Sequence, residues 1–284
     1  MNEPMLKVVS AEGPSTPLPA VEMVDVGGRR LSVAISGGGN PTVILETGLG
    51  AESSEWGAVE RLLADEFRIV RYDRANRGAS DPAPRPRRAS DMLADLRNML
   101  RAKRIGPPYV LVGHSFGGLL MRLFAAKYSG EVAGLVLVDS VHPDQFETFA
   151  PSFPPPTPNE PKDLAQVRTL YQGGWRDPAS TVEGIDFRAS FAEAPMTQML
   201  GDLPMQVIVA GTMLNQNAVP AAFRSGLQSQ WEGLQEQFVK LSTSAVRVDV
   251  PESSHFVQRD DPQSIVAAVR SVVAADRERN AYGG

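Results

Sequence analysis

The chain has 284 residues, no cysteine and only three histidines. The absence of cysteine excludes disulfides, thiolate catalysis and every cysteine-based zinc site. A histidine-rich metal cage would need all of His114, His142 and His255, so we expect no dedicated zinc site.

The sequence also lacks an excess of positive charge and a long hydrophobic run. Its 28 Lys and Arg against 33 Asp and Glu give a formal net charge of -5, which supplies no cationic field for phosphate backbones or anionic lipid. The longest apolar stretches are strand-sized, and the first twenty residues lack the pattern of a secretory signal. We therefore expect no nucleic-acid partner, no membrane insertion and a cytoplasmic monomer or homodimer.

The composition that remains is typical of a soluble globular protein, with 42% hydrophobic and 21% charged residues. At this length a folded chain buries about 75% of the surface that its unfolded form exposes, so no disulfide or structural metal is needed. We find no internal repeat and no linker long enough to separate two independent domains.

Apolar runs of strand length alternate with helical patterns along the chain. Gly27-Gly28, between the apolar segments 21–26 and 30–36, predicts a β-hairpin because its two-residue turn requires positive φ angles. Further strands are expected at 42–47, 67–72, 109–112, 132–139, 205–210 and 245–250, and helices at 54–65, 90–103, 117–128, 224–241 and from Asp261-Pro262 onward. Such alternation predicts an α/β fold with a doubly wound, mostly parallel sheet of about eight strands.

Two segments interrupt this alternation. Residues 1–20 are rich in Ser, Pro and Gly, so we expect a flexible N-terminal segment. Residues 141–203 contain many prolines with aromatic and methionine side chains between them, which predicts a cap or lid inserted into the fold. The core would then consist of residues 21–140 and 204–284.

A Gly-x-Ser-x-Gly motif, Gly113-His114-Ser115-Phe116-Gly117, joins the strand at 109–112 to a helix. The two glycines relieve the crowding of a sharp strand-to-helix turn, which presents the serine hydroxyl at the carboxyl edge of the sheet. We therefore predict Ser115 as a nucleophile, and we expect His114 to pack behind the turn.

A serine nucleophile needs a base, and the base needs a group that fixes its tautomer. His255 is the predicted base because it lies between the last strand and the last helix, at the same edge as Ser115. No acidic residue occurs from 203 through 231, whereas Asp139 ends the strand that is expected next to the strand at 109–112. Asp139 is therefore the predicted acid. Asp144 is the reserve candidate, and a loop-capping role for Asp139 stays open.

The oxyanion of a tetrahedral intermediate needs two preorganised donors. The backbone N–H of Phe116, directly after the serine, offers one. The turn Thr47-Gly48-Leu49-Gly50 follows the strand at 42–47, and the N–H of Leu49 is the predicted second donor. The neighbouring Glu46 is expected to be structural.

Two segments resemble motifs of the α/β-hydrolase fold family. One is the Gly-x-Ser-x-Gly turn around Ser115, called the elbow below, and the other is the stretch Tyr72-Asp73-Arg74-Ala75-Asn76-Arg77-Gly78-Ala79-Ser80. The resemblance covers residues 21–274, and the order Ser115, Asp139, His255 matches the order in that family. It implies the hydrolase fold, a catalytic triad and no metal or organic cofactor.

This sequence departs from the family pattern at two places. Thr47 stands where the family usually has histidine before the glycine, although the backbone donor is kept. The usual acid after the strand at 205–210 is missing, but some haloalkane dehalogenases and lactone hydrolases of the family carry it one strand earlier, as Asp139 would be here. Those dehalogenases and the epoxide hydrolases use an aspartate nucleophile, so Ser115 argues against both activities.

These motifs predict a serine esterase or lipase-like hydrolase that cleaves a carboxylic ester or lactone of an apolar small molecule. A small-molecule receptor with little turnover, a cofactor-free haloperoxidase and an acyltransferase are the alternatives with the same triad. The segment Gly48-x-Gly50-x-x-Ser53 imitates a dinucleotide fingerprint, but Ser53 replaces its third glycine and a hairpin precedes it, so NAD or FAD is not expected.

Four side chains are predicted to contact the substrate: Trp56, His142, Phe146 and Phe256. The aromatic composition of the segment 141–203 favours an apolar ligand. The same side chains could equally form the core of the cap itself.

Overall fold

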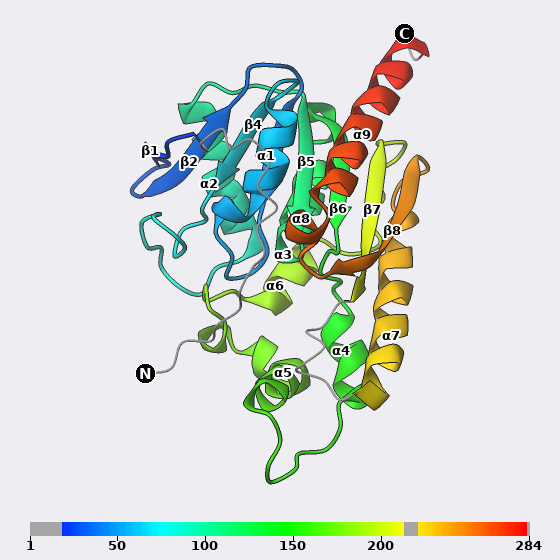
Figure 1. The fold of residues 1–284 in the computed structure, drawn as a ribbon. Coiled ribbons are helices and arrows are strands. Elements are labelled where there is room, and N and C mark those ends of the chain that lie inside the picture. Colours follow the sequence, from blue (N-terminus) through cyan, green and yellow to red (C-terminus); the bar gives the residue numbers. More distant parts are fainter. Residues whose placement is uncertain (1–18, 213–220, 283–284) are drawn as a thin grey trace.

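A computed structural model describes residues 19–212 and 221–282. The predicted flexible segment falls almost wholly on residues 1–18, which lie outside the described residues. Within the described ranges, eight strands form one sheet in the order β1-β2-β4-β3-β5-β6-β7-β8 (Figure 1).

The strands are mostly parallel. Their bounds are β1 Glu22–Asp25, β2 Arg30–Ser36, β3 Thr42–Glu46, β4 Arg68–Tyr72, β5 Tyr109–His114, β6 Val132–Val138, β7 Met205–Thr212 and β8 Ala245–Ser254. β2 pairs antiparallel with β1 and β4, and every other neighbouring pair is parallel. The predicted fold class is therefore confirmed.

The first two strands form the predicted hairpin. Gly27 and Gly28 adopt φ angles of 101° and 88°, and the N–H of Val26 donates to the carbonyl of Arg29 at 2.9 Å. A side chain at either glycine would strain the turn, which explains why glycine occupies both positions.

Helices cover both faces of the sheet (Figure 1). Their bounds are α1 Gly57–Leu63, α2 Ala89–Ala102, α3 Phe116–Lys127, α7 Ala221–Val239, α8 Val257–Asp260 and α9 Pro262–Tyr282, with 3₁₀ turns at η1 Ser53–Trp56 and η2 Ser129–Glu131. In β3, Val43 and Leu45 pack toward α1 and α9, whereas Ile44 packs toward α2, α3 and α7. Burial on both faces explains why the strand sequences read as continuous apolar runs.

The helices differ from the sequence prediction at two places. The single helix expected at 54–65 is the 3₁₀ turn η1 followed by α1. The short helix α8 was not predicted, since four residues are too few to show a helical period. The predicted start of α9 is confirmed, because the Asp261 carboxylate accepts from the N–H of Ser264 at 3.2 Å.

Residues 141–203, called the insert below, connect β6 to β7. Their helices are α4 Gln145–Phe149, η3 Ala150–Ser152, α5 Lys162–Gln172, η4 Gly174–Arg176, η5 Pro178–Ser180 and α6 Phe187–Glu193. Figure 1 shows α4, α5 and α6 gathered beyond the edge where the parallel strands end. This placement puts the insert over the edge that carries the predicted catalytic residues.

An aromatic cluster forms the interior of the insert. The ring of Phe146 stacks on Trp175 at 4.9 Å between centroids and meets the edge of Phe187 at 5.2 Å. Phe187 in turn meets Phe116 of α3 edge to face at 5.6 Å. These rings are buried, so they serve as the core of the insert and fasten it to the helix behind the elbow.

Of the helices in residues 19–212 and 221–282, none combines the length and the apolar character that crossing a membrane requires.

Candidate active site

Ser115 occupies a strained turn between β5 and α3. Its φ and ψ angles are 51° and -119°, a conformation that L-residues other than glycine rarely adopt. A Cβ on Gly113 would lie 2.5 Å from the carbonyl oxygen of Gly117, and one on Gly117 would lie 2.5 Å from that of Glu46. Both glycines of the motif are therefore required by backbone contact, as the sequence prediction supposed.

Asp139 follows β6 and is fully buried with a φ angle of 43°. Its Oδ2 lies 2.6 Å from Nδ1 of His255. Its Oδ1 accepts from the backbone N–H of Ala210 at 3.1 Å and from the indole N–H of Trp231 at 2.7 Å. Both carboxylate oxygens are thus engaged, and one of them orients the imidazole.

The reserve acid is placed elsewhere. The side chain of Asp144 is 68% exposed, and its Oδ2 is 3.9 Å from Nδ1 of His142. The structure therefore joins Asp139, and not Asp144, to His255.

His255 lies in the loop after β8, beside the elbow. The carboxylate of Asp139 at Nδ1 favours the tautomer with a proton on that nitrogen, which leaves the lone pair of Nε2 free to accept one. The His255 ring lies 4.6 Å from the ring of His114, the residue directly before Ser115. Within the described residues no hydrogen bond links the Ser115 hydroxyl to His255; this bond is commonly long in unliganded hydrolases and tightens on substrate binding.

His114 links the loop that carries His255 to the turn at Ser115. Its Nε2 lies 2.7 Å from the backbone carbonyl of His255, to which it donates. Burial, together with the nearby His255, holds the pKa of His114 well below 6.5. The ring of His114 is buried, in agreement with the expectation that it packs behind the turn.

The two predicted oxyanion donors belong to segments that adjoin the serine. A Cβ on Gly48 would lie 3.2 Å from the Cβ of Ser115, so the turn that carries Leu49 contacts the elbow directly. In the part of the chain that the structure describes, the N–H of Leu49 donates to no other group. Phe116 is the first residue of α3, so its N–H has no acceptor within the helix.

Three of the four predicted substrate contacts need correction. Trp56 has no exposed surface and packs among Val59, Leu63 and Ile265 in the core on the α1 and α9 face. A side chain without accessible surface does not line an open pocket, so Trp56 is a core residue.

The same correction applies to two residues of the insert region. His142 is fully buried with its ring 5.1 Å from that of Phe238, and Phe146 belongs to the aromatic cluster. Phe256, in contrast, is 37% exposed and its ring lies 5.6 Å from that of His255. Phe256 stays a predicted substrate contact.

Trp231 was missed by the sequence reasoning. It lies in α7, fully buried, and donates to an oxygen of Asp139, 92 positions earlier in the chain. No local pattern marks a tryptophan as the partner of so distant a carboxylate, and an aromatic residue in a helix usually indicates core packing.

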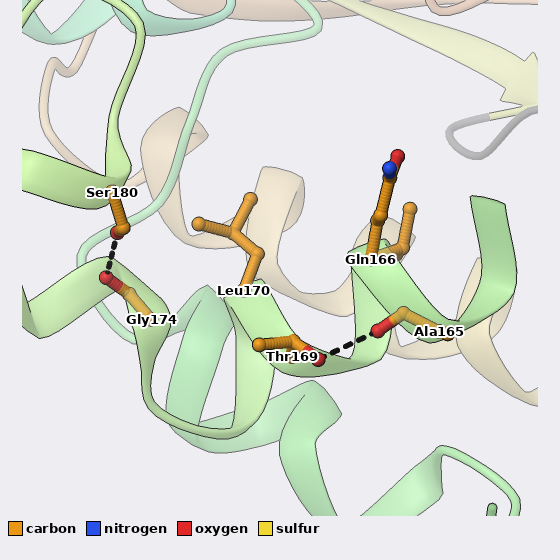
Figure 2. Close-up of a pocket in the computed structure, with 7 residues that line it drawn as sticks. Ala165, Gln166, Thr169, Leu170, Gly174 and Ser180 are labelled. Carbon is orange, nitrogen blue, oxygen red and sulfur yellow. Dashed lines mark hydrogen bonds between the residues drawn. The ribbon is translucent and has the colours of Figure 1, made fainter. Parts of the chain in front are cut away.

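A hollow of about 520 Å³ lies on the insert, along α5. Its lining consists of Ala165, Gln166, Val167, Thr169, Leu170, Gly174 and Ser180. Figure 2 shows the side chains of Gln166 and Leu170 projecting from α5 while Thr169 bonds back to the carbonyl of Ala165. The predicted substrate contacts and triad residues are not among these side chains.

The buried His142 makes the stability of the fold depend on pH. Burial, aided by the charge of Arg122, lowers the pKa of His142 from 6.5 to about 4. The unfolded chain therefore binds this proton at a higher pH than the folded chain does. The stabilisation is complete above the unfolded pKa of about 6.5 and decreases as the pH falls toward 4, by up to about 3 kcal/mol.

We expect His142→Asn to lose less stability than the wild type between pH 7 and pH 4.5, because asparagine does not titrate. Its Oδ1 still offers the N–H of Asp144 the acceptor that Nδ1 provides at 3.1 Å. Urea unfolding at several pH values measures the free energy of unfolding of both proteins. The same change of this free energy with pH in both would contradict the prediction.

Comparisons with known proteins agree with this architecture. A family model described as "alpha/beta hydrolase fold" matches residues 41–170. The uncharacterized protein YqjL of Bacillus subtilis (strain 168) is 27% identical over 241 residues, which are 84% of this chain and 86% of that protein.

Two solved structures extend the likeness to nearly the whole chain. One, described among novel epoxide hydrolases from metagenomes of hot environments, has a TM-score of 0.62 at 19% identity and covers 90% of this chain and 99% of its own. The enol-lactonase from Burkholderia xenovorans LB400 has a TM-score of 0.62 at 18% identity and covers 89% of this chain and 100% of its own. The protein has the α/β-hydrolase fold, and the resemblance predicted from its motifs is confirmed.

Proposed function

We propose that the protein is a serine hydrolase that cleaves a carboxylic ester or lactone of an apolar small molecule through an acyl-enzyme. The observation that carries this proposal is the 2.6 Å contact between the buried Asp139 carboxylate and Nδ1 of His255, beside the strained turn at Ser115. A carboxylate-oriented imidazole next to a serine on such a turn is the arrangement that activates a hydroxyl nucleophile.

In the proposed mechanism the Ser115 oxygen attacks the carbonyl carbon while Nε2 of His255 takes its proton. Asp139 stabilises the imidazolium that forms, and the N–H groups of Leu49 and Phe116 donate to the oxyanion. The imidazolium then protonates the leaving alkoxide as the tetrahedral intermediate collapses. His255 next activates a water, which releases the acid from Ser115.

We assign the insert the role of a cap over this site. Its helices stand beyond the carboxyl edge of the sheet (Figure 1), and its aromatic cluster packs on Phe116. Because the aromatic rings of the insert pack in its own core, Phe256 is the apolar side chain that we propose for substrate contact near His255.

A chain-length series of p-nitrophenyl esters tests the proposal. Many turnovers per protein molecule support a hydrolase, whereas a single turnover with retained product supports a receptor. Activity in a peracid assay alone would favour a haloperoxidase. Acyl transfer to a competing alcohol would favour an acyltransferase. An aspartate-nucleophile reaction is disfavoured because the elbow residue is Ser115.

Trp231→Phe should lower kcat about tenfold to a hundredfold and leave KM nearly unchanged, because it removes one hydrogen bond to a charged carboxylate worth about 1.5–3 kcal/mol. The matched control is Trp56→Phe, since the Trp56 indole N–H is buried with no partner within the described structure. Steady-state kinetics on one p-nitrophenyl ester compare the two. Equal losses in both variants would mean that Trp231 only fills space.

A further inference from the structure

The insert contributes a carboxylate to a buried ion-pair cluster beside the predicted oxyanion turn. Arg74, after β4, is fully buried. Its guanidinium lies 2.5 Å from Glu46 at the end of β3 and 2.6 Å from Glu183 of the insert. A second bond, from Nε of Arg74, reaches Glu183 Oε2 at 2.8 Å.

The same cluster holds the backbone on both sides of Leu49. Arg74 donates to the carbonyl oxygens of Thr47 and Gly48, each at 2.7 Å. Glu183 Oε1 accepts the N–H of Gly50 at 2.8 Å. Three backbone groups next to Leu49 are therefore fixed by two side chains.

This arrangement sets the direction of the predicted oxyanion donor. In a planar trans peptide the carbonyl and the N–H point in opposite directions. Because Arg74 binds the carbonyl of Gly48, the N–H of Leu49 in the same peptide unit points away from Arg74. That N–H donates to no group in the described structure, so it remains available to a ligand.

The charges favour an ionised Glu183. Burial opposes its charge, but the adjacent Arg74 outweighs burial and lowers the pKa of this carboxyl. Burial raises the pKa of Glu46 despite Arg74, and Glu46 also accepts from the hydroxyl of Tyr72. Glu183 is thus the carboxylate that binds Arg74 through both oxygens and also reaches the turn.

We propose that Glu183 is a positioning residue that holds the turn at residues 47–50, through Arg74 and directly at Gly50, in the conformation that aims the Leu49 N–H at the oxyanion. This inference rests on the proposed hydrolase function. It makes catalysis depend on docking of the insert, since the residue that completes the turn comes from the insert and not from the core.

The chain offers a matched control for the loss of a buried carboxylate. Glu60 of α1 pairs with Arg71 at 2.6 Å, and both side chains are buried. Glu60 also accepts from the hydroxyl of Ser36, and Arg71 also donates to the hydroxyl of Ser53. Among the described residues, neither side chain bonds to the turn at 47–50. Glu60→Gln removes the same charge from a comparable pair.

The experiment compares the full-length wild type, Glu183→Gln and Glu60→Gln. The readouts are kcat and KM for p-nitrophenyl butyrate and the inhibition constant of an aryl trifluoromethyl ketone, which forms an anionic adduct with an active serine. We expect Glu183→Gln to lower kcat about a hundredfold, close to the loss of one oxyanion donor, and to weaken the ketone by a similar factor with KM within about twofold. Glu60→Gln should stay within about threefold on every readout.

Equal losses in the two variants, or a change confined to KM, would overturn the inference while leaving the hydrolase proposal intact. A wild type that neither turns over esters nor binds the ketone would overturn the proposed function, and this inference with it. Near-UV circular dichroism checks that the variants fold. If Glu183→Gln does not fold, Glu183→Asp takes its place, because aspartate keeps the charge on a shorter side chain. We then expect the same result, with larger losses of kcat and of ketone inhibition than in Glu60→Gln.

Discussion

We expect Ser115→Ala to reduce ester turnover to the background that binding and the oxyanion donors alone sustain, a loss on the order of 10⁵- to 10⁶-fold in kcat. The reason is chemical: alanine has no oxygen to form the acyl-enzyme, and the imidazole has no proton to remove. The turn itself should persist, because its shape is set by the close backbone contacts at Gly113 and Gly117.

The measurement is kcat on p-nitrophenyl butyrate, together with intact-mass detection of a fluorophosphonate label. Ser254→Ala is the control, since this serine directly precedes His255 and its hydroxyl bonds to Asp260. Labelling should disappear only in Ser115→Ala. Full activity of Ser115→Ala would show that Ser115 is not the nucleophile.

Asp139→Asn should lower kcat by about 10⁴-fold, the loss known when a triad acid becomes its amide. An amide does not stabilise the imidazolium as a carboxylate does. It also turns an N–H₂ group toward at least one of the donors that now bind the carboxylate, at His255, Ala210 and Trp231.

Asp144→Asn provides the comparison, because its exposed side chain lies near His142 and not near the base. It should change kcat by less than about threefold, as expected for a solvent-exposed charge. The acid assignment is wrong if Asp144→Asn is the crippling substitution and Asp139→Asn is mild.

The sequence predicted the fold well because its signals are local. A strand covered on both faces must be apolar along its whole length, and the hairpin turn must have glycine at residues 27 and 28. The elbow is equally local, since five consecutive residues place Ser115 at a strand-to-helix corner. Asp139 is predicted by elimination, because the stretch 203–231 contains no acid.

The supporting residues were not predictable in this way. Trp231 meets Asp139 across 92 positions, and Glu183 meets Arg74 across 109. Such pairs depend on how helices and loops pack in space. For the same reason Trp56 and His142 were misassigned, since an aromatic residue or a histidine in an apolar stretch does not reveal whether it faces a pocket or the interior.

The backbone at Ser115 carries a further consequence for protein engineering. Its left-handed φ angle costs a residue with a side chain on the order of 1–3 kcal/mol, a strain that glycine would not feel. At the proposed nucleophile, thermal stability and activity therefore favour different residues. Screens that select only for a higher melting temperature should therefore favour Ser115→Gly, which relieves the strain but removes the hydroxyl that the proposed reaction needs.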